Sequence, residues 1–347
     1  MTQPKPILIN KNIMKIAING FGRIGRQALH IILQEKRDLE VVAINDLTDN
    51  ATLAHLFAFD STYGRYPGKV EAVGKDSIKV DGKTIKIYAE KDPVALPWGK
   101  LGVEVVLECS GHFTDPELAS KHIQAGAKRV IVSAPCSGTK PADANIVMGV
   151  NEDIFDPKKH FIISNASCTT NCLAPVAKVL NDTFGIKRGF MTTVHAATND
   201  QRILDLPHKD LRRARSTLMS MIPTSTGAAK AVGLVIPELK GKMTGISVRV
   251  PLPTVSLVDL VVEVEKKASV ESVNEAFAKY AKKNPRIMVV ETRPLVSVDF
   301  KQDSHSASID ALNTMVLQDQ MVKVLAWYDN EWGYTTRLVD LAEYISK

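Results

Sequence analysis

The sequence lacks any apolar run of the roughly 18 residues that a bilayer span needs, so an integral membrane protein is excluded and no membrane partner is expected. Cysteine is scarce, since four residues in a chain of 347 do not make a disulfide framework. No Cys-x-x-Cys pair occurs, and Cys168 and Cys172 have no matching pair of histidines, so no metal site is expected. The N-terminus, MTQPKPILINKNIMK, lacks the apolar core of a signal peptide. These absences predict a cytoplasmic protein with reduced thiols and a loose N-terminal extension, residues 1–13.

Blocks of like charge are also missing. Lys and Arg exceed Asp and Glu by 44 to 38, a net charge of +6, yet they are scattered along the chain. We therefore expect a mildly basic enzyme and no nucleic-acid partner. A protein that binds nucleic acid through its charge is the alternative, and salt-dependent RNA binding would support it. The length and the 45% hydrophobic content predict two globular domains.

The first half alternates short apolar runs with helical patterns, which is typical of a parallel sheet with helices on both faces. Strands are expected at residues 15–19, 39–45, 103–108, 129–133, 145–148 and 161–164. Helices are expected at residues 24–36 and 115–124. Residues 77–90 differ, because their alternation around Asp81-Gly82 predicts a hairpin.

The second half has longer runs of strand pattern and fewer helices, which predicts an α+β domain with a mainly antiparallel sheet. Strands are expected at residues 187–195, 245–250, 256–266, 287–291 and 322–328. Helices are expected at residues 168–184, 269–283 and 336–346. Residues 196–217 show no clear period.

The segment Gly20-Phe21-Gly22-Arg23-Ile24-Gly25 follows a strand and opens a helix, which is the context of a dinucleotide-binding turn. Glycine lets the backbone approach a pyrophosphate, whose charge meets the helix N-terminus. Asp46 stands 21 residues after Gly25, where it would bond ribose hydroxyls and repel a 2′-phosphate, so NAD is favoured over NADP. The alternative is a plain helix start and a surface aspartate. The expected fold is α/β, with a Rossmann-type parallel sheet domain followed by the α+β domain.

Cys168 opens the helix that follows an apolar strand, and a helix N-terminus lowers the pKa of a thiol. Cys172, one turn further in, fits a buried small side chain better. About 25 Å of helix from Cys168 to Gly185 matches about 26 Å of strand from Lys187 to His195. An antiparallel strand therefore brings His195 level with Cys168, as a nucleophile and its acid/base require. A structural histidine is the alternative.

Basic and hydroxyl side chains gather after His195. Arginine, threonine and a glycine amide together suit phosphate-type anions, and a solvated basic loop is the alternative. The group consists of Thr198, Arg212, Arg213, Arg215, Thr224, Ser225, Thr226, Gly227 and Arg249.

Three segments carry a family resemblance: NGFGRIGR at 19–26, SNASCTTNC at 164–172 and WYDNEWGY at 327–334. From about Met14 to its C-terminus, the chain resembles the phosphorylating, NAD-dependent glyceraldehyde-3-phosphate dehydrogenases of the glycolytic type. The resemblance implies a homotetramer. It also implies an NAD-binding domain of residues 14–166 with 331–347 and a catalytic domain of residues 167–330.

The implied reaction is the oxidative phosphorylation of D-glyceraldehyde 3-phosphate to 1,3-bisphosphoglycerate, with NAD and inorganic phosphate. It passes through a Cys168 thioester, with His195 as acid/base. The implied cofactor-binding residues are Gly20, Gly22, Arg23, Ile24, Gly25, Asp46, Lys91, Ser133 and Asn330. Thr198 and Arg249 match the residues that hold the phosphate of the substrate. The positions that match the site of inorganic phosphate are Ser167, Thr169, Arg213, Thr226 and Gly227.

The alternative within this chemistry is erythrose-4-phosphate dehydrogenase, a sister enzyme with the same thiol and imidazole. Thr226-Gly227 and the arginine-rich loop match the glyceraldehyde branch better. His112 stands where many members have Arg, and Cys109 and Cys136 are extra thiols. These departures leave the expected activity intact, and they leave the sensitivity to oxidation open.

Overall fold

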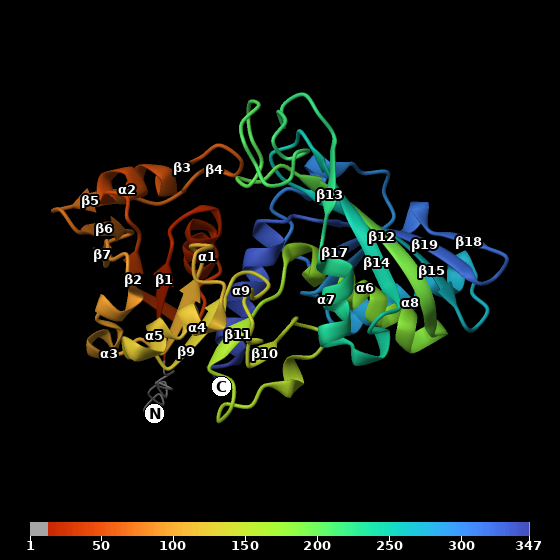
Figure 1. The fold of residues 1–347 in the computed structure, drawn as a ribbon, viewed down its shortest axis with the longest axis horizontal. Coiled ribbons are helices and arrows are strands. Elements are labelled where there is room, and N and C mark those ends of the chain that lie inside the picture. Colours follow the sequence, from red (N-terminus) through yellow and green to blue (C-terminus); the bar gives the residue numbers. More distant parts are fainter. Residues whose placement is uncertain (1–12, 347) are drawn as a thin grey trace, which may run out of the picture.

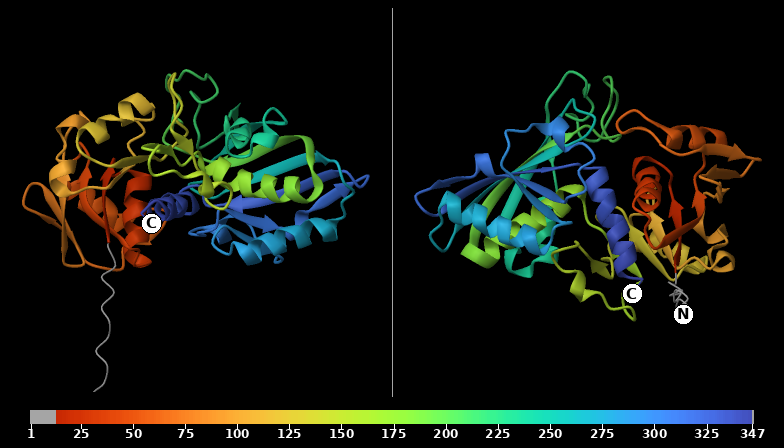
Figure 2. Two further views of the ribbon diagram at one scale, coloured as in Figure 1. Left: turned by 90° about the horizontal axis from the view of Figure 1, so that it is seen from below. Right: turned by 180° about the vertical axis from the view of Figure 1, so that it is seen from behind.

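The computed structural model describes residues 13–346. It has two lobes, each built on its own β-sheet, with the C-terminal helix α9 (Trp332–Tyr344) between them (Figures 1 and 2). The predicted extension, residues 1–13, lies outside the described residues except for Ile13. In the described part, no helix combines the length and apolarity that a membrane crossing needs.

The first sheet is mostly parallel, in the order β10-β11-β9-β8-β1-β2-β7-β6-β5. Its strands are β1 Met14–Asn19, β2 Leu39–Asn45, β5 Val70–Val73, β6 Ser77–Val80, β7 Lys83–Tyr88, β8 Val105–Glu108, β9 Arg129–Val132, β10 Ala144–Asn145 and β11 Ile162–Ser164. The predicted hairpin is confirmed, because β6 and β7 pair antiparallel. Strand β7 also pairs parallel with β2, so the hairpin extends the parallel sheet.

Helices pack around this sheet, and two of them differ from the sequence-based expectation. The helices are α1 Arg23–Gln34, α2 Asn50–Ala58, α3 Trp98–Leu101, α4 Pro116–Ala119 and α5 Lys121–Gln124. The helix predicted over 115–124 is two short helices, α4 and α5, and the Ser120 hydroxyl between them donates to the Glu117 carbonyl. Helix α2 was not predicted, although Asp49 caps it by accepting from the Thr52 N–H.

The second sheet has the order β13-β14-β12-β15-β19-β17-β16, with β18 beside β19. Its strands are β12 Ile186–Ala196, β13 Ile222–Ser225, β14 Met243–Val250, β15 Ser256–Val264, β16 Met288–Glu291, β17 Ala307–Asp310, β18 Met315–Leu317 and β19 Met321–Tyr328. Most neighbours pair antiparallel, while β12 with β14 and β16 with β17 pair parallel. The predicted mainly antiparallel sheet is therefore confirmed.

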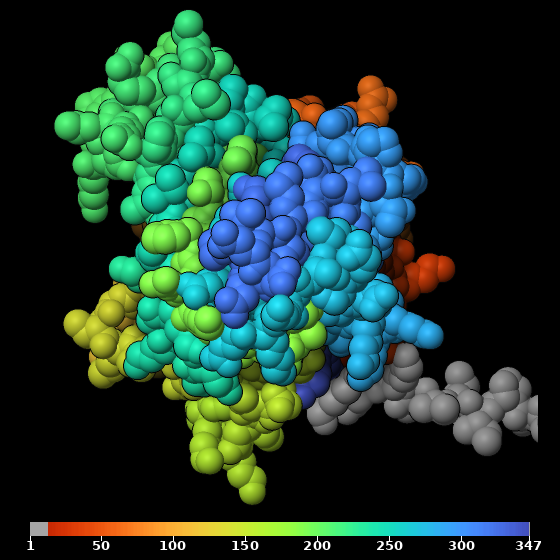
Figure 3. Space-filling view, turned by 90° about the vertical axis from the view of Figure 1, so that its right-hand side faces the viewer, coloured from red at the N-terminus to blue at the C-terminus, as the bar shows by residue number. Residues whose placement is uncertain are grey.

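One face of the second sheet packs on helices and the other is open. Helices α6 Cys168–Phe184, α7 Ala228–Val235 and α8 Val270–Lys283 share a core with the inward side chains of the strands. On the open face, Phe190 is 72% exposed and Ile246 is half exposed. Residues 197–221 form no regular element, and Figure 3 shows this segment, in green, standing out from the body.

Helix α9 begins at Trp332, whereas the sequence predicts a start at Thr336. The earlier start follows from Asp329, whose carboxylate accepts from the N–H groups of Glu331 and Trp332 and so satisfies the first turn. Leu338 and Val339 of this helix belong to the core of the first sheet. The first described strand and the last helix thus share one core.

Short 3-10 helices occupy Pro93–Ala95, Glu152–Ile154, Pro237–Leu239, Ser297–Phe300 and Ala311–Asn313, and a small separate sheet consists of β3 Phe59–Asp60 and β4 Gly64–Arg65.

Candidate active site

The turn from β11 to α6 places Cys168 at the first position of a long helix. Ala166 in this turn has a left-handed backbone, φ 55°, which directs the chain from the sheet edge into the helix. The Ser167 hydroxyl then accepts from the Thr170 N–H at 3.0 Å and caps the helix. The turn itself therefore satisfies part of the helix N-terminus and holds the thiol at the sheet edge.

His195 lies next to this thiol, as the helix and strand lengths predict. It is the penultimate residue of β12, which runs back along the sheet beside α6, and its Nε2 is 3.4 Å from Cys168 Sγ. The imidazole is buried, while Cys168 is partly exposed. The two groups come from segments that only the fold brings together.

Two groups compete for the other nitrogen of this imidazole. The Ala196 carbonyl lies 2.7 Å from His195 Nδ1, and Arg249 Nη1 lies 2.6 Å from the same atom. A carbonyl only accepts and a guanidinium only donates, so the first needs a proton on Nδ1 and the second needs its absence. The tautomer of His195 is therefore coupled to the position of Arg249.

Burial sets the charge state of the pair in this structure. Burial and the nearby Arg249 lower the pKa of His195 to about 3. Burial raises the pKa of the Cys168 thiol, against the opposing effects of Arg249 and Thr169. The N–H groups of Cys168 and Thr169 at the helix N-terminus do lower this thiol pKa, as expected, but desolvation outweighs them, so the expected net lowering is wrong. Cys172 is fully buried and its thiol pKa is also raised by burial, in agreement with the predicted packing role.

A cavity of about 390 Å³ opens over Cys168 and His195. Its lining joins residues from both lobes: Arg23, Ile24, Thr62, Cys168, His195, Ala197, Thr198, Asn199, Pro253, Asn330 and Glu331. Arg23 is held there by ion pairs of 2.6 Å with Asp60 and with Glu331. We call this space the thiol cavity. It brings together six of the residues that the sequence analysis assigned to the site.

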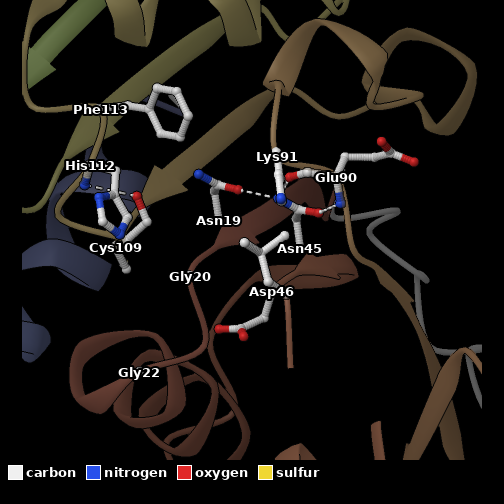
Figure 4. A pocket seen from close by; sticks show the side chains of 12 residues that line it. Asn19, Gly20, Gly22, Asn45, Asp46, Glu90, Lys91, Cys109, His112 and Phe113 are labelled. Atoms are coloured by element: carbon white, nitrogen blue, oxygen red, sulfur yellow. Dashed lines mark hydrogen bonds between the residues drawn. The ribbon is translucent and has the colours of Figure 1, made fainter. Parts of the chain in front are cut away.

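A second cavity, of about 550 Å³, lies at the carboxyl ends of β1, β2 and β8 (Figure 4). Four of the predicted cofactor residues line this cofactor cavity: Gly20, Gly22, Asp46 and Lys91. Asp46 Oδ2 accepts from the Phe21 N–H at 2.8 Å, which ties the end of β2 to the glycine turn. Ligands bind at this edge of parallel sheets.

The glycine turn fits a pyrophosphate. Gly20 has φ +89°, and a Cβ there would lie 2.5 Å from the Ser110 backbone. A Cβ on Gly22 would meet nothing within 4 Å, so this backbone faces open space in the cavity. In the described part of the chain, no side chain caps α1, which leaves its first N–H groups for an anion. The residues present therefore fit a dinucleotide such as NAD.

Polar residues that end the strands of the first sheet form a connected row that the sequence analysis missed. Asn45 Nδ2 donates to Asn19 Oδ1 at 2.7 Å, and Asn19 Nδ2 donates to the buried Glu108 at 2.5 Å. Glu108 also accepts from the Ser110 N–H. Each of the three ends an apolar strand, as Figure 4 shows for the two asparagines, and that position was a usable signal in the sequence.

Two predicted cofactor residues do not line either cavity. Gly25 packs against the turn instead, since a Cβ there would lie 2.1 Å from the Gly20 carbonyl oxygen. Ser133 follows β9, and its N–H donates to the Glu108 carbonyl. Gly25 therefore contacts the glycine turn, and Ser133 contacts the end of β8.

Of the predicted phosphate ligands, Thr198 lines the thiol cavity and Arg249 contacts His195. The others do not line it. The Ser167 hydroxyl hydrogen-bonds to the Thr170 hydroxyl, and the Thr169 hydroxyl to the Tyr328 hydroxyl. Arg213 is bonded to Asp200 and to Thr224, and Thr226 accepts from the Ala228 N–H beside Gly227, at the start of α7.

Two family models and several known proteins match the sequence of this chain. The model of the glyceraldehyde 3-phosphate dehydrogenase NAD binding domain matches residues 14–116, and that of the C-terminal domain matches residues 167–330. The chain is 58% identical to the glyceraldehyde-3-phosphate dehydrogenase of Geobacillus stearothermophilus, over 96% of this chain and 98% of the relative. It is 56% identical to glyceraldehyde-3-phosphate dehydrogenase 1 of Bacillus subtilis, with the same coverage. The chain is also 54% identical to glyceraldehyde-3-phosphate dehydrogenase 2 of Streptomyces avermitilis, over 96% of this chain and 98% of the relative.

Proposed function

Since the chain belongs to the glyceraldehyde-3-phosphate dehydrogenase family, we propose that Cys168 is its nucleophile and His195 its general acid/base. The enzyme is an NAD-dependent oxidoreductase of glycolysis that converts glyceraldehyde 3-phosphate and inorganic phosphate to 1,3-bisphosphoglycerate. Erythrose-4-phosphate dehydrogenase is not favoured, because relatives of 53–58% identity carry the glyceraldehyde name. The observation that carries the residue roles is the 3.4 Å approach of His195 Nε2 to Cys168 Sγ.

The thiol begins the reaction by giving its proton to His195. Nε2 is the base nearest to Sγ, and the thiolate left behind adds to the aldehyde carbon of the substrate. The imidazolium returns the proton to the new alkoxide, which gives a hemithioacetal on Cys168. Desolvation opposes charge on both groups, so the proton moves within the pair as the carbon–sulfur bond forms.

Oxidation leaves an acyl group on the same sulfur. NAD, held by the cofactor residues, would supply the hydride acceptor for the hemithioacetal carbon. His195 takes the hydroxyl proton at that moment, so that a thioester forms on Cys168. Inorganic phosphate then attacks the thioester carbon, which releases 1,3-bisphosphoglycerate and restores the thiolate.

Arg249 couples substrate binding to the tautomer of the base. We assign it, with Thr198, to the phosphate of the substrate, because Thr198 lines the thiol cavity and Arg249 contacts His195. A phosphate that engages this guanidinium removes a donor from Nδ1. The Ala196 carbonyl then keeps the proton on Nδ1, and Nε2 is left as the free base that faces Sγ.

The second anion site rests on the match to the family pattern. We assign it to Ser167, Thr169, Arg213, Thr226 and Gly227. Arg213 here pairs with Asp200, so an incoming phosphate has to displace a carboxylate. That exchange retains a charge-assisted partner for the guanidinium throughout.

The cofactor assignment covers both cavities. Arg23, Ile24 and Asn330 line the thiol cavity, where the nicotinamide end has to lie for hydride transfer. The cofactor cavity takes the adenosine end, with Asp46 toward the ribose hydroxyls and Lys91 beside it. The complete set is Gly20, Gly22, Arg23, Ile24, Gly25, Asp46, Lys91, Ser133 and Asn330.

The two hydrophobic cores support the domain boundaries that we propose. We assign residues 14–166 with 331–347 to NAD binding and residues 167–330 to catalysis. In support, buried side chains of α9 belong to the core of the first sheet, and α6, α7 and α8 share the core of the second.

A homotetramer agrees with the surface of the catalytic lobe. Large apolar side chains lie exposed on its open sheet face and in the segment 197–221, where Leu211 is 81% and Met219 is 88% exposed. Exposed apolar area of this kind indicates contact with further subunits. Sedimentation of the purified enzyme at micromolar concentration tests this assignment, and a monomer would contradict it.

A cytoplasmic location agrees with the cysteines, all four of which are unpaired. Fractionation of the producing cells, with detection of the enzyme by its activity, tests the assignment.

Two measurements test the roles of Cys168 and His195. The first is the appearance of reduced nicotinamide from glyceraldehyde 3-phosphate and NAD, with and without phosphate, beside erythrose 4-phosphate and NADP controls. We expect turnover to require phosphate and NAD. The second is mass spectrometry of enzyme quenched without phosphate, where we expect the acyl mass on the Cys168 peptide. An acyl group on another residue would contradict the proposal.

A further inference from the structure

One peptide unit beside the catalytic base makes hydrogen bonds in two directions. The Ala196 carbonyl lies 2.7 Å from His195 Nδ1, and the Ala196 N–H donates to Ser256 Oγ at 3.1 Å. Ser256 is the first residue of β15, next to β12, and is 1% exposed. Its hydroxyl lies 2.9 Å from Asn330 Oδ1. A continuous row of hydrogen bonds therefore joins the base to Asn330, a residue of the thiol cavity.

The chemistry of each group fixes the direction of the last bond. A backbone N–H only donates, so Ser256 Oγ uses a lone pair for Ala196 and still has its proton to give. A buried hydroxyl proton needs an acceptor, and within the described residues Asn330 supplies the one in reach. The atom of Asn330 that faces Ser256 is therefore the oxygen.

This orientation leaves the Asn330 amide nitrogen on the side of the cavity. Asn330 lines the thiol cavity with Cys168 and His195. In the part of the chain that the structure describes, no group accepts a hydrogen bond from Asn330 Nδ2. The side chain thus offers a donor to whatever binds beside the thiol.

We propose that Ser256 is a positioning residue that holds the Asn330 amide with Nδ2 toward the carboxamide oxygen of the nicotinamide. The proposal rests on the cofactor assignment made above. Without the Ser256 hydroxyl, the amide is free to turn its oxygen toward that carboxamide oxygen, and two acceptors then face each other. Because Ala196 bonds both His195 and Ser256, the base and the nicotinamide-binding amide share one backbone support.

The affinities of two ligands show whether Ser256 positions the Asn330 amide or only stabilises the fold. The ligands are NAD and ADP-ribose, which is NAD without its nicotinamide ring, and their dissociation constants are measured by calorimetry. In Ser256→Ala we expect NAD to bind roughly 3- to 10-fold more weakly, the effect of one misdirected neutral hydrogen bond. ADP-ribose affinity should stay unchanged, because the adenosine end does not touch Asn330.

The matched control is Ser247→Ala. Ser247 lies on β14 and is also 1% exposed, and its hydroxyl has no hydrogen-bond partner among residues 13–346. Its removal should change neither affinity. Thermal unfolding of both variants, followed by circular dichroism, shows whether loss of a buried hydroxyl alters the fold itself.

A double-mutant cycle shows whether Ser256 acts through Asn330. In an Asn330→Ala background, Ser256→Ala should have no further effect on NAD affinity, because the group that it orients is gone. Additive effects, or equal weakening of NAD and ADP-ribose, would overturn the role of Ser256 alone. If the Asn330→Ala single variant binds NAD as tightly as wild type, the role of Ser256 is overturned together with the cofactor assignment of Asn330.

Discussion

The turn from β1 to α1 and the turn from β11 to α6 leave the same edge of the same parallel sheet, and each opens a helix. In the first, Gly22 precedes a helix that no side chain of the described residues caps. In the second, Ser167 caps the helix through the Thr170 N–H. One helix start is thus left free for an anionic ligand, while the other is satisfied from within and presents a side chain.

The difference shows how one local geometry supports two kinds of chemistry. The glycine turn works through its backbone, so its requirement is the absence of side chains. The cysteine turn works through a thiol, which depends on His195 and Arg249 from the second sheet. A binding turn is therefore nearly complete within its own strand and helix, whereas a reactive turn needs partners from elsewhere.

Cys168→Ala separates the two turns most sharply. We expect turnover to fall at least about 10⁴-fold, because removal of a nucleophile removes the covalent route. NAD affinity should stay within about twofold, since the glycine turn is untouched. Steady-state rates and calorimetric NAD titration measure the two effects. Residual turnover near wild type would refute the nucleophile assignment.

His195→Asn tests whether the reactive turn depends on the second sheet. Loss of a positioned acid/base should reduce turnover roughly 10²–10⁴-fold. The acyl-enzyme should still form slowly, because the thiol remains. Rapid-quench mass spectrometry of the Cys168 peptide follows this step. An unaltered pH–rate profile in the variant would speak against the role of His195.

The same substitution should change how stability depends on pH. The folded enzyme lowers the pKa of His195 to about 3, below the value of about 6.5 in an unfolded chain. The unfolded state therefore binds the extra proton between these values, so this residue favours folding above pH 6.5 and loses that effect as pH falls toward 3. Urea midpoints from pH 4 to 8 should fall less steeply toward acid in His195→Asn than in wild type. Parallel curves would contradict the lowered pKa.

Gly22→Ala should damage the binding turn and spare the reactive one. The new methyl group enters the cofactor cavity without a clash in the protein, so we expect a stable fold and about tenfold weaker NAD binding, or about 1.4 kcal/mol. The rate of Cys168 alkylation by iodoacetamide should not change. Gly99→Ala is the control, because its Cβ would make ordinary 3.5 Å contacts far from either turn. If Gly22→Ala and Gly99→Ala bind NAD equally well, the proposed contact between the Gly22 backbone and NAD is contradicted.

Ser167→Ala removes the cap that distinguishes the second turn. We expect the free energy of unfolding to drop by about 1 kcal/mol, the usual effect of losing an N-cap side chain. Urea denaturation measures it. Ser269→Ala, which removes the cap of α8 far from the site, should cost a similar amount and leave turnover intact. A larger loss in Ser269→Ala than in Ser167→Ala would indicate that the cap at the reactive turn contributes little.

Much of the fold could be predicted from periodicity, and the errors have local causes. The parallel sheet and the hairpin followed from apolar runs and Asp81-Gly82. Helix α9 starts earlier than expected because Asp329, deep in the fold, satisfies its first N–H groups. Strand β17 escaped prediction because its residues, ASID, show no alternation and are buried on both faces.

The site likewise contains residues that local sequence identified and residues that only strand pairing brings together. Local motifs identified the glycine turn and Cys168, and the strand length placed His195, because these depend on residues close in sequence. Arg249, Ser256 and Asn330 come together near His195 through pairing between β12, β14, β15 and the end of β19. No local pattern encodes that register.

By itself the sequence determined which turns can bind a dinucleotide and which helix presents a thiol, since backbone freedom and helix starts are local properties. Only the tertiary structure decided the charge state of that thiol and of His195, because their desolvation and the distance to Arg249 arise when β12 pairs with β14 and packs beside α6. It also decided the direction of the Asn330 amide, because a hydrogen bond needs both of its partners in place.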